Sequence, residues 1–397
     1  MINYSRCCQR IASFAGLLSF FLFSCRAAKV SQPVAKVTGR DSVWNATHIA
    51  AFEKRLERLR ERYHVPGLSA GVVNGQQLVW KKGFGYANRE LQQAPDENTV
   101  YQVASVTKTF GAIILMQQVE AGKISLDDPI GKYGINLGAR WGSDPRIKLK
   151  HLLTHTAMGN MYNSYKPGYV FRYNGGWYNE LAKPIAQASG HRFGELLMEQ
   201  IIVPLSLKST APSTDDSLDF ALTGYDKAAF MQRVAKPYDW KNKQLVPVKF
   251  TYGFGPAAGM MSTVTDLAVY SNAIDEGKFL NDSTWKKIFT PFVTRKGKTI
   301  QYGLGWYVTY YKGLKVVWHT GWWTGYSALF VKIPEKDLSF IILANSQDLS
   351  RPFYHLVRVG PLGFSNPFRH NLKKHLTASD FGRAFLEYFV ADKRNGF

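Results

Sequence analysis

The chain has 397 residues, of which 45% are hydrophobic and 14% aromatic, so it can bury a large globular core as one domain or as two lobes. Its 50 Lys and Arg against 29 Asp and Glu give a formal charge of +21, which favours an anionic environment such as nucleic acid, a lipid surface or an acidic polymer. Binding to nucleic acid is not expected, because the sequence has no glycine-rich phosphate loop, nucleic-acid motif or repeat.

The first 24 residues have the composition of a signal peptide. Arg6 and Arg10 precede an apolar run over residues 11–23, which is too short to span a bilayer as a helix. The run ends in Leu22-Phe-Ser-Cys25, which resembles the lipobox of bacterial lipoproteins, where the cysteine is lipidated and becomes the mature N-terminus. An ordinary signal peptide or an uncleaved anchor is the alternative.

The cysteine positions agree with processing at Cys25. Cys7 and Cys8 lie in the segment that would be removed, so the mature chain would form no internal disulfide. Residues 25–47 are expected to form a tether. A lipid on Cys25 would anchor the protein to the membrane of a bacterial cell envelope, facing the periplasm, and the positive charge would favour anionic phospholipid or wall polymer there.

The first elements of the main domain are predicted by periodicity. Apolar residues recur at helical spacing over 48–62, which predicts an amphipathic helix that Pro66-Gly67 ends. A β-hairpin follows, with strands at 68–73 and 76–80 around the favoured turn pair Asn74-Gly75.

The rest of the chain predicts an inserted lobe and then a sheet. The middle, about 122–258, is rich in loops, with helical pieces expected at 147–154, 177–189 and 193–202 and no evident series of strands. A capped helix from Ser262 and four strand-like runs follow, at 302–310, 314–319, 326–333 and 338–344. The expected fold class is α/β (α+β): an antiparallel sheet flanked by helices, built from N- and C-terminal segments, with an inserted, mostly helical lobe.

The predicted domain boundaries follow from this pattern. With a signal peptide at 1–24 and a tether at 25–47, the main domain is expected over 48–346, and its catalytic residues in the cleft between the lobes. Residues 347–397 are expected to form a basic loop, either solvated or surface-binding, and a packing helix at 378–390.

Two Ser-x-x-Lys sequences occur, Ser105-Val-Thr-Lys108 and Ser283-Thr-Trp-Lys286. Residues i and i+3 share one face of a helix, and a lysine with a lowered pKa can take the proton of a neighbouring hydroxyl and make it a nucleophile. The first pair begins the apolar run 109–119. The second follows a capping sequence and is expected in a short surface helix, so Ser105 is the candidate nucleophile.

A lysine-activated serine also needs a proton carrier, donors for an oxyanion and a strand that docks the substrate. Tyr173, on a glycine-bracketed loop, and the triplet His319-Thr320-Gly321, at the end of a predicted strand, are candidates. His151 and His155 have metal-like i, i+4 spacing but lack the glutamate of the metalloprotease motif, so we expect a structural role at a helix end and no metal site.

Three ordered motifs give the chain its resemblance to a known family: Ser105-Val-Thr-Lys108, Tyr173-Asn-Gly175 and His319-Thr-Gly321. Together they resemble the β-lactamase-related serine hydrolases, which include class C β-lactamases, penicillin-binding D,D-peptidases, esterases and D-aminopeptidases. Further segments that resemble family signatures lie at 151–156, 204–210, 257–263, 302–306 and 333–337, so the resemblance extends from about 48 to 346.

The resemblance implies a role for each motif. Ser105 would attack a carbonyl and form an acyl-enzyme, Lys108 or Tyr173 would accept its proton, and Tyr173 would pass one to the leaving group. A protonated His319, together with Lys108, would lower the pKa of Tyr173. The backbone N–H groups of Ser105 and Trp322 would form the oxyanion hole. The residues expected to bind substrate are Asn174, Thr320 and Gly321, and no cofactor is implied.

Two departures from the family pattern bear on the substrate. The second motif is usually Tyr-x-Asn, whose asparagine binds the substrate amide, whereas this chain has Gly175 there and Asn174 before it. The third motif carries His319 where lactamases and peptidases commonly have lysine, so recognition of a substrate carboxylate would be weaker and pH-dependent. The change at His319 is closer to the esterase and aminopeptidase branches, and both changes argue against a β-lactamase.

The expected function is therefore that of a serine hydrolase that acts through an acyl-enzyme on an ester or amide at the cell envelope. The substrate classes left open are a D-amino-acid peptide, a β-lactam-like molecule and a small ester. A non-catalytic binding protein of the same fold and an acyltransferase are the alternatives.

Overall fold

The computed structural model describes residues 44–138, 140–159, 166–214, 218–249, 253–350, 353 and 375–391. The predicted signal peptide, residues 25–43 of the predicted tether with the lipidation site Cys25, and the basic segment at 354–374 lie outside the described residues. The last two residues assigned to the tether, 46 and 47, belong instead to the first helix, which begins at Ala46. Within the described part of the chain, no helix has the length and apolar character needed to cross a membrane.

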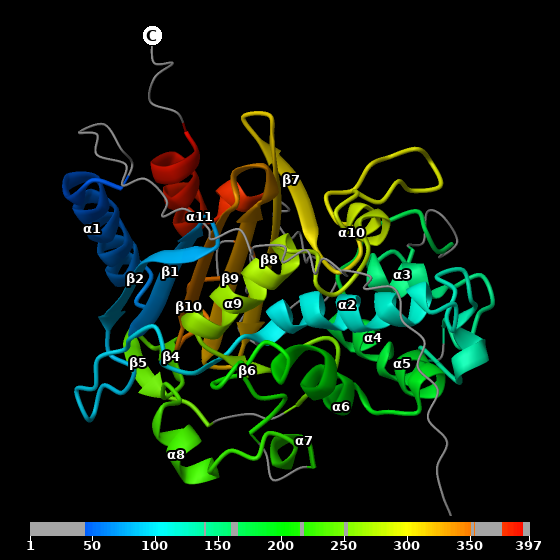
Figure 1. Ribbon diagram of the computed structural model, residues 1–397, viewed down its shortest axis with the longest axis horizontal. Coiled ribbons are helices and arrows are strands. Elements are labelled where there is room, and N and C mark those ends of the chain that lie inside the picture. The colour runs from blue at the N-terminus through cyan, green and yellow to red at the C-terminus, as the bar shows by residue number, and fades with distance from the viewer. Residues whose placement is uncertain are drawn as a thin grey trace, which may run out of the picture. The chain divides into compact units, whose positions relative to one another are not determined.

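A six-stranded antiparallel sheet joins the two ends of the described chain (Figure 1). Its strands, in spatial order, are β2 (Gln77–Gly85), β1 (Gly67–Asn74), β10 (Leu338–Ala344), β9 (Tyr326–Ile333), β8 (Leu314–Trp323) and β7 (Tyr307–Tyr311). The pairing of β1 with β10, which sets Leu68 opposite Ala344, unites segments that are far apart in sequence. The predicted fold class, with an antiparallel sheet built from both ends, is confirmed.

The strand predicted at 302–310 begins later than expected, at Tyr307. Glycines cause the difference. A Cβ atom on Gly303 would lie 2.1 Å from the carbonyl oxygen of Ile288, and Gly305 has a left-handed backbone with φ of 80°. This segment therefore turns inward against the helical lobe before the strand starts.

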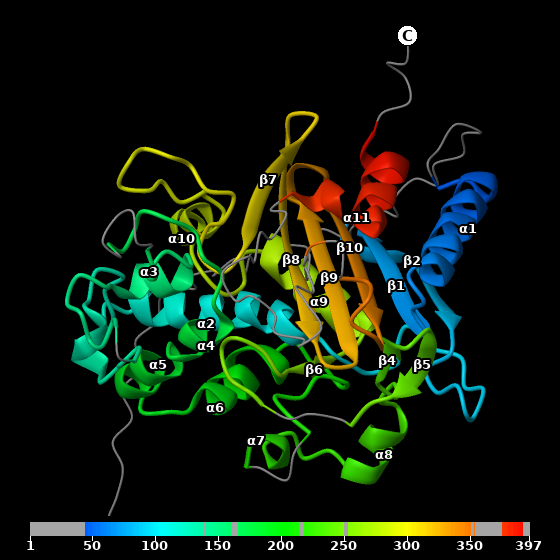
Figure 2. The ribbon, with the colours of Figure 1, turned by 180° about the vertical axis from the view of Figure 1, so that it is seen from behind.

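Helices cover both faces of the sheet (Figures 1 and 2). Helix α1 (Ala46–Arg62) buries Phe52, Leu56 and Leu59 on one face, where Phe385 of α11 (Asp380–Phe385) stacks on Phe340 of β10 with ring centroids 4.9 Å apart. The helices α2 (Thr107–Glu120) and α9 (Val264–Asp275) pack on the opposite face. The predicted helices at both ends and the capped helix after Ser262 are thus present.

The middle of the chain supplies most of the remaining elements. Its helices are α3 (Leu149–Leu153), α4 (Gly175–Asn179), α5 (Ala182–Ser189), α6 (Phe193–Leu197) with a π-helical turn at Met198–Ile202, α7 (Leu218–Ala221) and α8 (Lys227–Gln232). A two-stranded pair, β3 (Tyr101–Gln102) with β6 (Met261–Ser262), connects this lobe to the sheet. The loop before β7 carries α10 (Asp282–Ile288).

A hairpin of β4 (Tyr238–Lys241) and β5 (Gln244–Pro247) was not predicted. Its turn residues, Asn242 and Lys243, both have positive φ, as a tight hairpin turn requires. The usual sequence signal for that turn is a glycine, which this position lacks, and each strand is only four residues long.

A buried ion pair ties α9 to the sheet. Lys332 of β9 is 1% exposed, and its Nζ donates to Asp275 Oδ2 at 2.8 Å and to the hydroxyl oxygen of Ser271 at 2.6 Å. Burial lowers the pKa of Lys332 and raises that of Asp275, so each charge depends on the other for compensation. Asp275 also lines a cavity of about 380 Å³.

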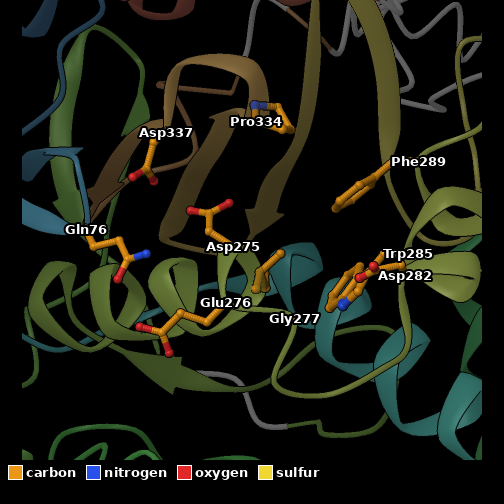
Figure 3. A pocket seen from close by; sticks show the side chains of 10 residues that line it. Gln76, Asp275, Glu276, Gly277, Asp282, Trp285, Phe289, Pro334 and Asp337 are labelled. Carbon is orange, nitrogen blue, oxygen red and sulfur yellow. The ribbon is translucent and has the colours of Figure 1, made fainter. Parts of the chain in front are cut away.

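That cavity is separate from the predicted catalytic residues, none of which lines it. Figure 3 shows the carboxylates of Asp275 and Asp337 on one side of the cavity and the rings of Trp285 and Phe289 on the other.

We predict that Lys332→Met lowers the free energy of unfolding by about 3 kcal/mol, because it leaves the Asp275 carboxylate buried without a cation. Urea denaturation measures the change. Lys336→Met, at an exposed position in the next turn, is the matched control and should cost less than about 0.5 kcal/mol. An equal effect of both substitutions would show that the ion pair does not stabilise the fold.

Candidate active site

Ser105 lies in a single 3₁₀ turn, Ala104–Val106, directly before α2. Ala104 has a left-handed backbone with φ of 49°, an uncommon state for a residue with a side chain. Thr107 holds this turn, since its hydroxyl donates to the carbonyl oxygen of Ala104 at 2.7 Å and accepts the N–H of Met260 at 3.3 Å. The local backbone therefore fixes Ser105, which is 8% exposed.

Lys108 lies one helical turn later and is completely buried. Its Nζ is 3.2 Å from Ser105 Oγ and donates to the carbonyl oxygen of Ala257 at 2.6 Å. The rings of Tyr173 and Tyr178 flank it, with centroids 5.0 and 5.2 Å from Nζ. Burial lowers the pKa of Lys108 to about 7. A substantial share of the amine is therefore neutral near pH 7 and can accept the Ser105 proton.

The Tyr173-Asn174-Gly175 segment leads into α4. The ring of Tyr173 lies beside Lys108, whereas the side chain of Asn174 caps the helix, with Oδ1 accepting the N–H of Trp177 at 3.0 Å. That oxygen is thus occupied, and the predicted substrate contact of Asn174 would need another group. A Cβ atom on Gly175 would lie at an ordinary contact distance, 3.8 Å, from Lys108 Nζ, so the position usually held by asparagine directly adjoins the amine but carries no side chain.

Strand β8 passes close to the Ser105 turn because of Gly321. A Cβ atom there would lie 2.2 Å from the carbonyl oxygen of Val103, so the missing side chain admits the chain's own backbone rather than substrate. Thr320 is also turned away from solvent, with its hydroxyl donating to the carbonyl oxygen of Ala328 at 3.1 Å and bonded to Ser350 at 2.7 Å. Trp322 follows in the same strand, and its part in an oxyanion hole stays a prediction.

His319 is completely buried, and its ring contacts those of Tyr173, Tyr302 and Tyr307. Its Nδ1 donates to the carbonyl oxygen of Thr320 at 2.7 Å, and Nε2 lies 3.0 Å from the hydroxyl oxygen of Tyr302, whose proton it accepts when the ring is neutral. Burial, and then the positive charge of Lys108, lower the pKa of His319 to about 3. The expectation of a protonated His319 is therefore wrong, because its ring is neutral near pH 7.

His151 and the second Ser-x-x-Lys pair, which contains Ser283, both lie in short helices. His151 accepts the N–H of Lys148 at 3.0 Å within the first turn of α3, which confirms its structural role. Asn281 caps α10, and Ser283 donates to the Asn281 side chain at 2.7 Å, as expected for a surface helix. Among the described residues, no three His, Cys, Asp or Glu side chains gather as a metal site would require.

His155 also ends a helix, but its surroundings were not anticipated. Its ring centroid lies 4.2 Å from that of Tyr173, and the charge of Lys108 contributes, after burial, to lowering its pKa well below the usual value. The sequence signal available for it was its place in 151–156, one of the segments that resemble family signatures.

Comparison with known proteins gives the same assignment as the motifs. The family described as Beta-lactamase matches residues 52–357. The chain belongs to the beta-lactamase family. Members of this family are serine hydrolases, and the arrangement of Ser105 and Lys108 in this chain fits that chemistry.

Relatives and solved structures agree with this family. The chain is 23% identical to Penicillin-binding protein 4* of Bacillus subtilis over 74% of its own length and 70% of that protein's, and it spans 61–62% of the length of other curated relatives. It is similar to the octameric penicillin-binding protein homologue from Pyrococcus abyssi, with 26% identity, a TM-score of 0.63, and 76% and 74% of the two chains covered. A D-stereospecific amidohydrolase from Streptomyces sp. shares the fold, with 22% identity, a TM-score of 0.62, and 75% and 94% covered.

We predict that a fluorophosphonate reacts with Ser105 at a rate that rises with pH through about 7 and then levels off. The base is the neutral amine of Lys108, so the rate falls about tenfold per pH unit below the pKa. Intact-mass spectrometry over time gives the rate constants.

Two variants control this measurement. Lys108→Met should abolish the reaction, and Lys286→Met, in the second Ser-x-x-Lys pair, should leave it unchanged. A rate that is flat between about pH 5.5 and 8.5 would contradict the assignment of Lys108 as the base.

Proposed function

We propose that the protein is a serine hydrolase that forms an acyl-enzyme on Ser105. The observation that carries this proposal is the pairing of Ser105 Oγ with Lys108 Nζ at 3.2 Å, where Lys108 is buried and has a pKa of about 7. A lysine on an exposed surface would be protonated at neutral pH and could not act as a base. Burial in this chain produces the neutral amine that nucleophile activation needs.

The proposed reaction uses the groups around Lys108. Lys108 takes the Ser105 proton as Oγ attacks the substrate carbonyl, and the hydrogen bond to Ala257 directs another N–H away from the serine. Tyr173, beside the amine, carries a proton to the leaving group. The N–H groups of Ser105 and Trp322 hold the oxyanion, and water then releases the acyl group.

The proposed substrates are esters or amides in which no carboxylate needs to be recognised next to the scissile bond. His319 stands where a lysine would supply a positive charge, but its ring is neutral and both of its nitrogens are engaged within the protein. A neutral histidine gives little attraction for a carboxylate. Gly175 carries no side chain beside Lys108, and part of the substrate is proposed to lie at this position.

The proposed location is the bacterial cell envelope, with the protein lipid-anchored through Cys25 and facing the periplasm. The support is the Leu22-Phe-Ser-Cys25 sequence after an apolar run. Membrane fractionation of the wild type and of Cys25→Ala tests it, and an unchanged membrane fraction in the variant would refute the anchor.

We predict Ser105-dependent turnover of p-nitrophenyl esters or D-alanyl p-nitroanilide. Ser105→Ala should lower kcat at least about a thousandfold, since it removes the nucleophile, and Ser283→Ala should leave kcat unchanged. Binding without turnover in the wild type would identify a binding protein. Amide products in the presence of added amines would identify an acyltransferase.

The same assay tests the substrate preference. An N-acylglycyl ester of methyl glycolate should be hydrolysed with a kcat/KM at least about tenfold above that of the ester of free glycolate, after correction for the rates with hydroxide. The two substrates differ only in whether the carboxyl group of the glycolate part is a methyl ester or a free carboxylate. A preference for the free carboxylate would contradict the proposed substrate class.

A further inference from the structure

We propose that His155 is a positioning residue that holds Tyr173 in place against Lys108. This inference rests on the proposed function, because it assigns a task within the same reaction. His155 follows α3, is 3% exposed and has a left-handed backbone with φ of 53°, so its carbonyl and its ring both face the segment that carries Tyr173.

Two hydrogen bonds to His155 enclose Tyr173. The N–H of Arg172 donates to the carbonyl oxygen of His155 at 2.7 Å, and the N–H of Asn174 donates to its Nδ1 at 3.2 Å. The residues on both sides of Tyr173 are therefore bonded to the same histidine. The backbone of Tyr173 has little freedom to shift while both bonds are present.

The ring of His155 constrains the side chain of Tyr173 as well. The ring centroids of His155 and Tyr173 are 4.2 Å apart, with an angle of 37° between the ring planes. Tyr173 also contacts Lys108, whose Nζ lies 5.0 Å from the Tyr173 centroid. The ring centroids of Tyr178 and Tyr302 lie 5.5 and 5.1 Å from that of His155. These two rings hold the imidazole in position.

The protonation state of His155 fits this task. Because Nδ1 accepts a backbone N–H, it carries no proton, and the ring must be neutral for this bond to form. Burial, followed by the positive charge of Lys108, lowers the pKa of His155 well below its usual value, so the bond persists across the working pH range.

His151 provides a matched comparison within the same segment. It is equally buried, at 1% exposed, and its Nδ1 also accepts a backbone N–H, but that of Lys148 in its own helical turn. A purely structural histidine should behave like His151 on substitution, whereas a positioning residue should change the reaction.

The test is a double-mutant cycle between His155→Ala and Tyr173→Phe, with ester hydrolysis as the readout. Alanine removes both the ring and the acceptor, and this chain already tolerates alanine in a left-handed backbone at Ala104. His155→Ala should lower kcat by roughly 10- to 100-fold, with KM changed by less than about threefold. In the Tyr173→Phe background the same substitution should lower kcat by less than about threefold, because Tyr173 is no longer there to be positioned.

Two further variants separate positioning from stability. His155→Asn keeps an acceptor near the position of Nδ1 and suits a left-handed backbone, so it should recover most of the kcat that His155→Ala loses. His151→Ala should lower the melting temperature but leave kcat within about threefold of the wild type. The inflection of the pH profile near 7 should remain in His155→Ala, because Lys108 still provides the base.

Equal losses of kcat in both Tyr173 backgrounds, or a kcat loss in His151→Ala as large as in His155→Ala, would overturn the inference. If His155→Ala does not fold, His155→Gly, which also lacks the ring and the acceptor and suits the left-handed backbone, replaces it in the cycle, and a loss that is independent of Tyr173 overturns the inference in the same way. A wild type without Ser105-dependent turnover would instead refute the proposed function.

Discussion

The desolvated amine of Lys108 is the feature on which the rest of the site depends. An ammonium group loses its hydration when it is buried, which destabilises the charged form relative to the neutral amine. The pKa of Lys108 therefore falls to about 7. The surrounding packing enforces that burial. The hydroxyl of Tyr178 donates to the carbonyl oxygen of Lys108 at 3.0 Å. The inward turn at Gly305 approaches the same oxygen so closely that a Cβ atom on Gly305 would lie 3.1 Å from it. The close strand-to-helix packing that forms the fold thus also produces the neutral amine that the proposed mechanism requires.

Electrostatics around the site contrast with the charge of the whole chain. The sequence carries a formal charge of +21, yet Lys108 is partly neutral and His155 and His319 are neutral near pH 7. Each of these groups is buried, and the positive charge of Lys108 further disfavours protonation of both histidines. Among the described Lys and Arg residues, only Lys108 and Lys332 are buried, so the charge of the described part lies mainly at exposed positions away from the site.

Much of the fold followed from periodicity, because amphipathic helices and alternating strands reflect burial directly. The nucleophile pair was separable from its copy at Ser283 by the apolar helix that follows it. What escaped prediction depends on contacts between distant segments. Neither the neutral state of His319, which results from burial and the nearby charge of Lys108, nor the role of Asn174 as a helix cap is encoded in a local motif. His155 was assigned only a helix end because its ring contact with Tyr173 forms in the folded chain alone.

The most direct test is a measurement of the Lys108 pKa itself. Lysine labelled with ¹³C at Cε reports its own titration by NMR, and the Lys108→Met variant identifies the Lys108 signal by its disappearance. A midpoint near pH 7 for that signal, with the exposed lysines remaining protonated, is the expected result. A Lys108 midpoint above about pH 9.5, near that of an ordinary lysine, would contradict the assignment of Lys108 as the base of Ser105.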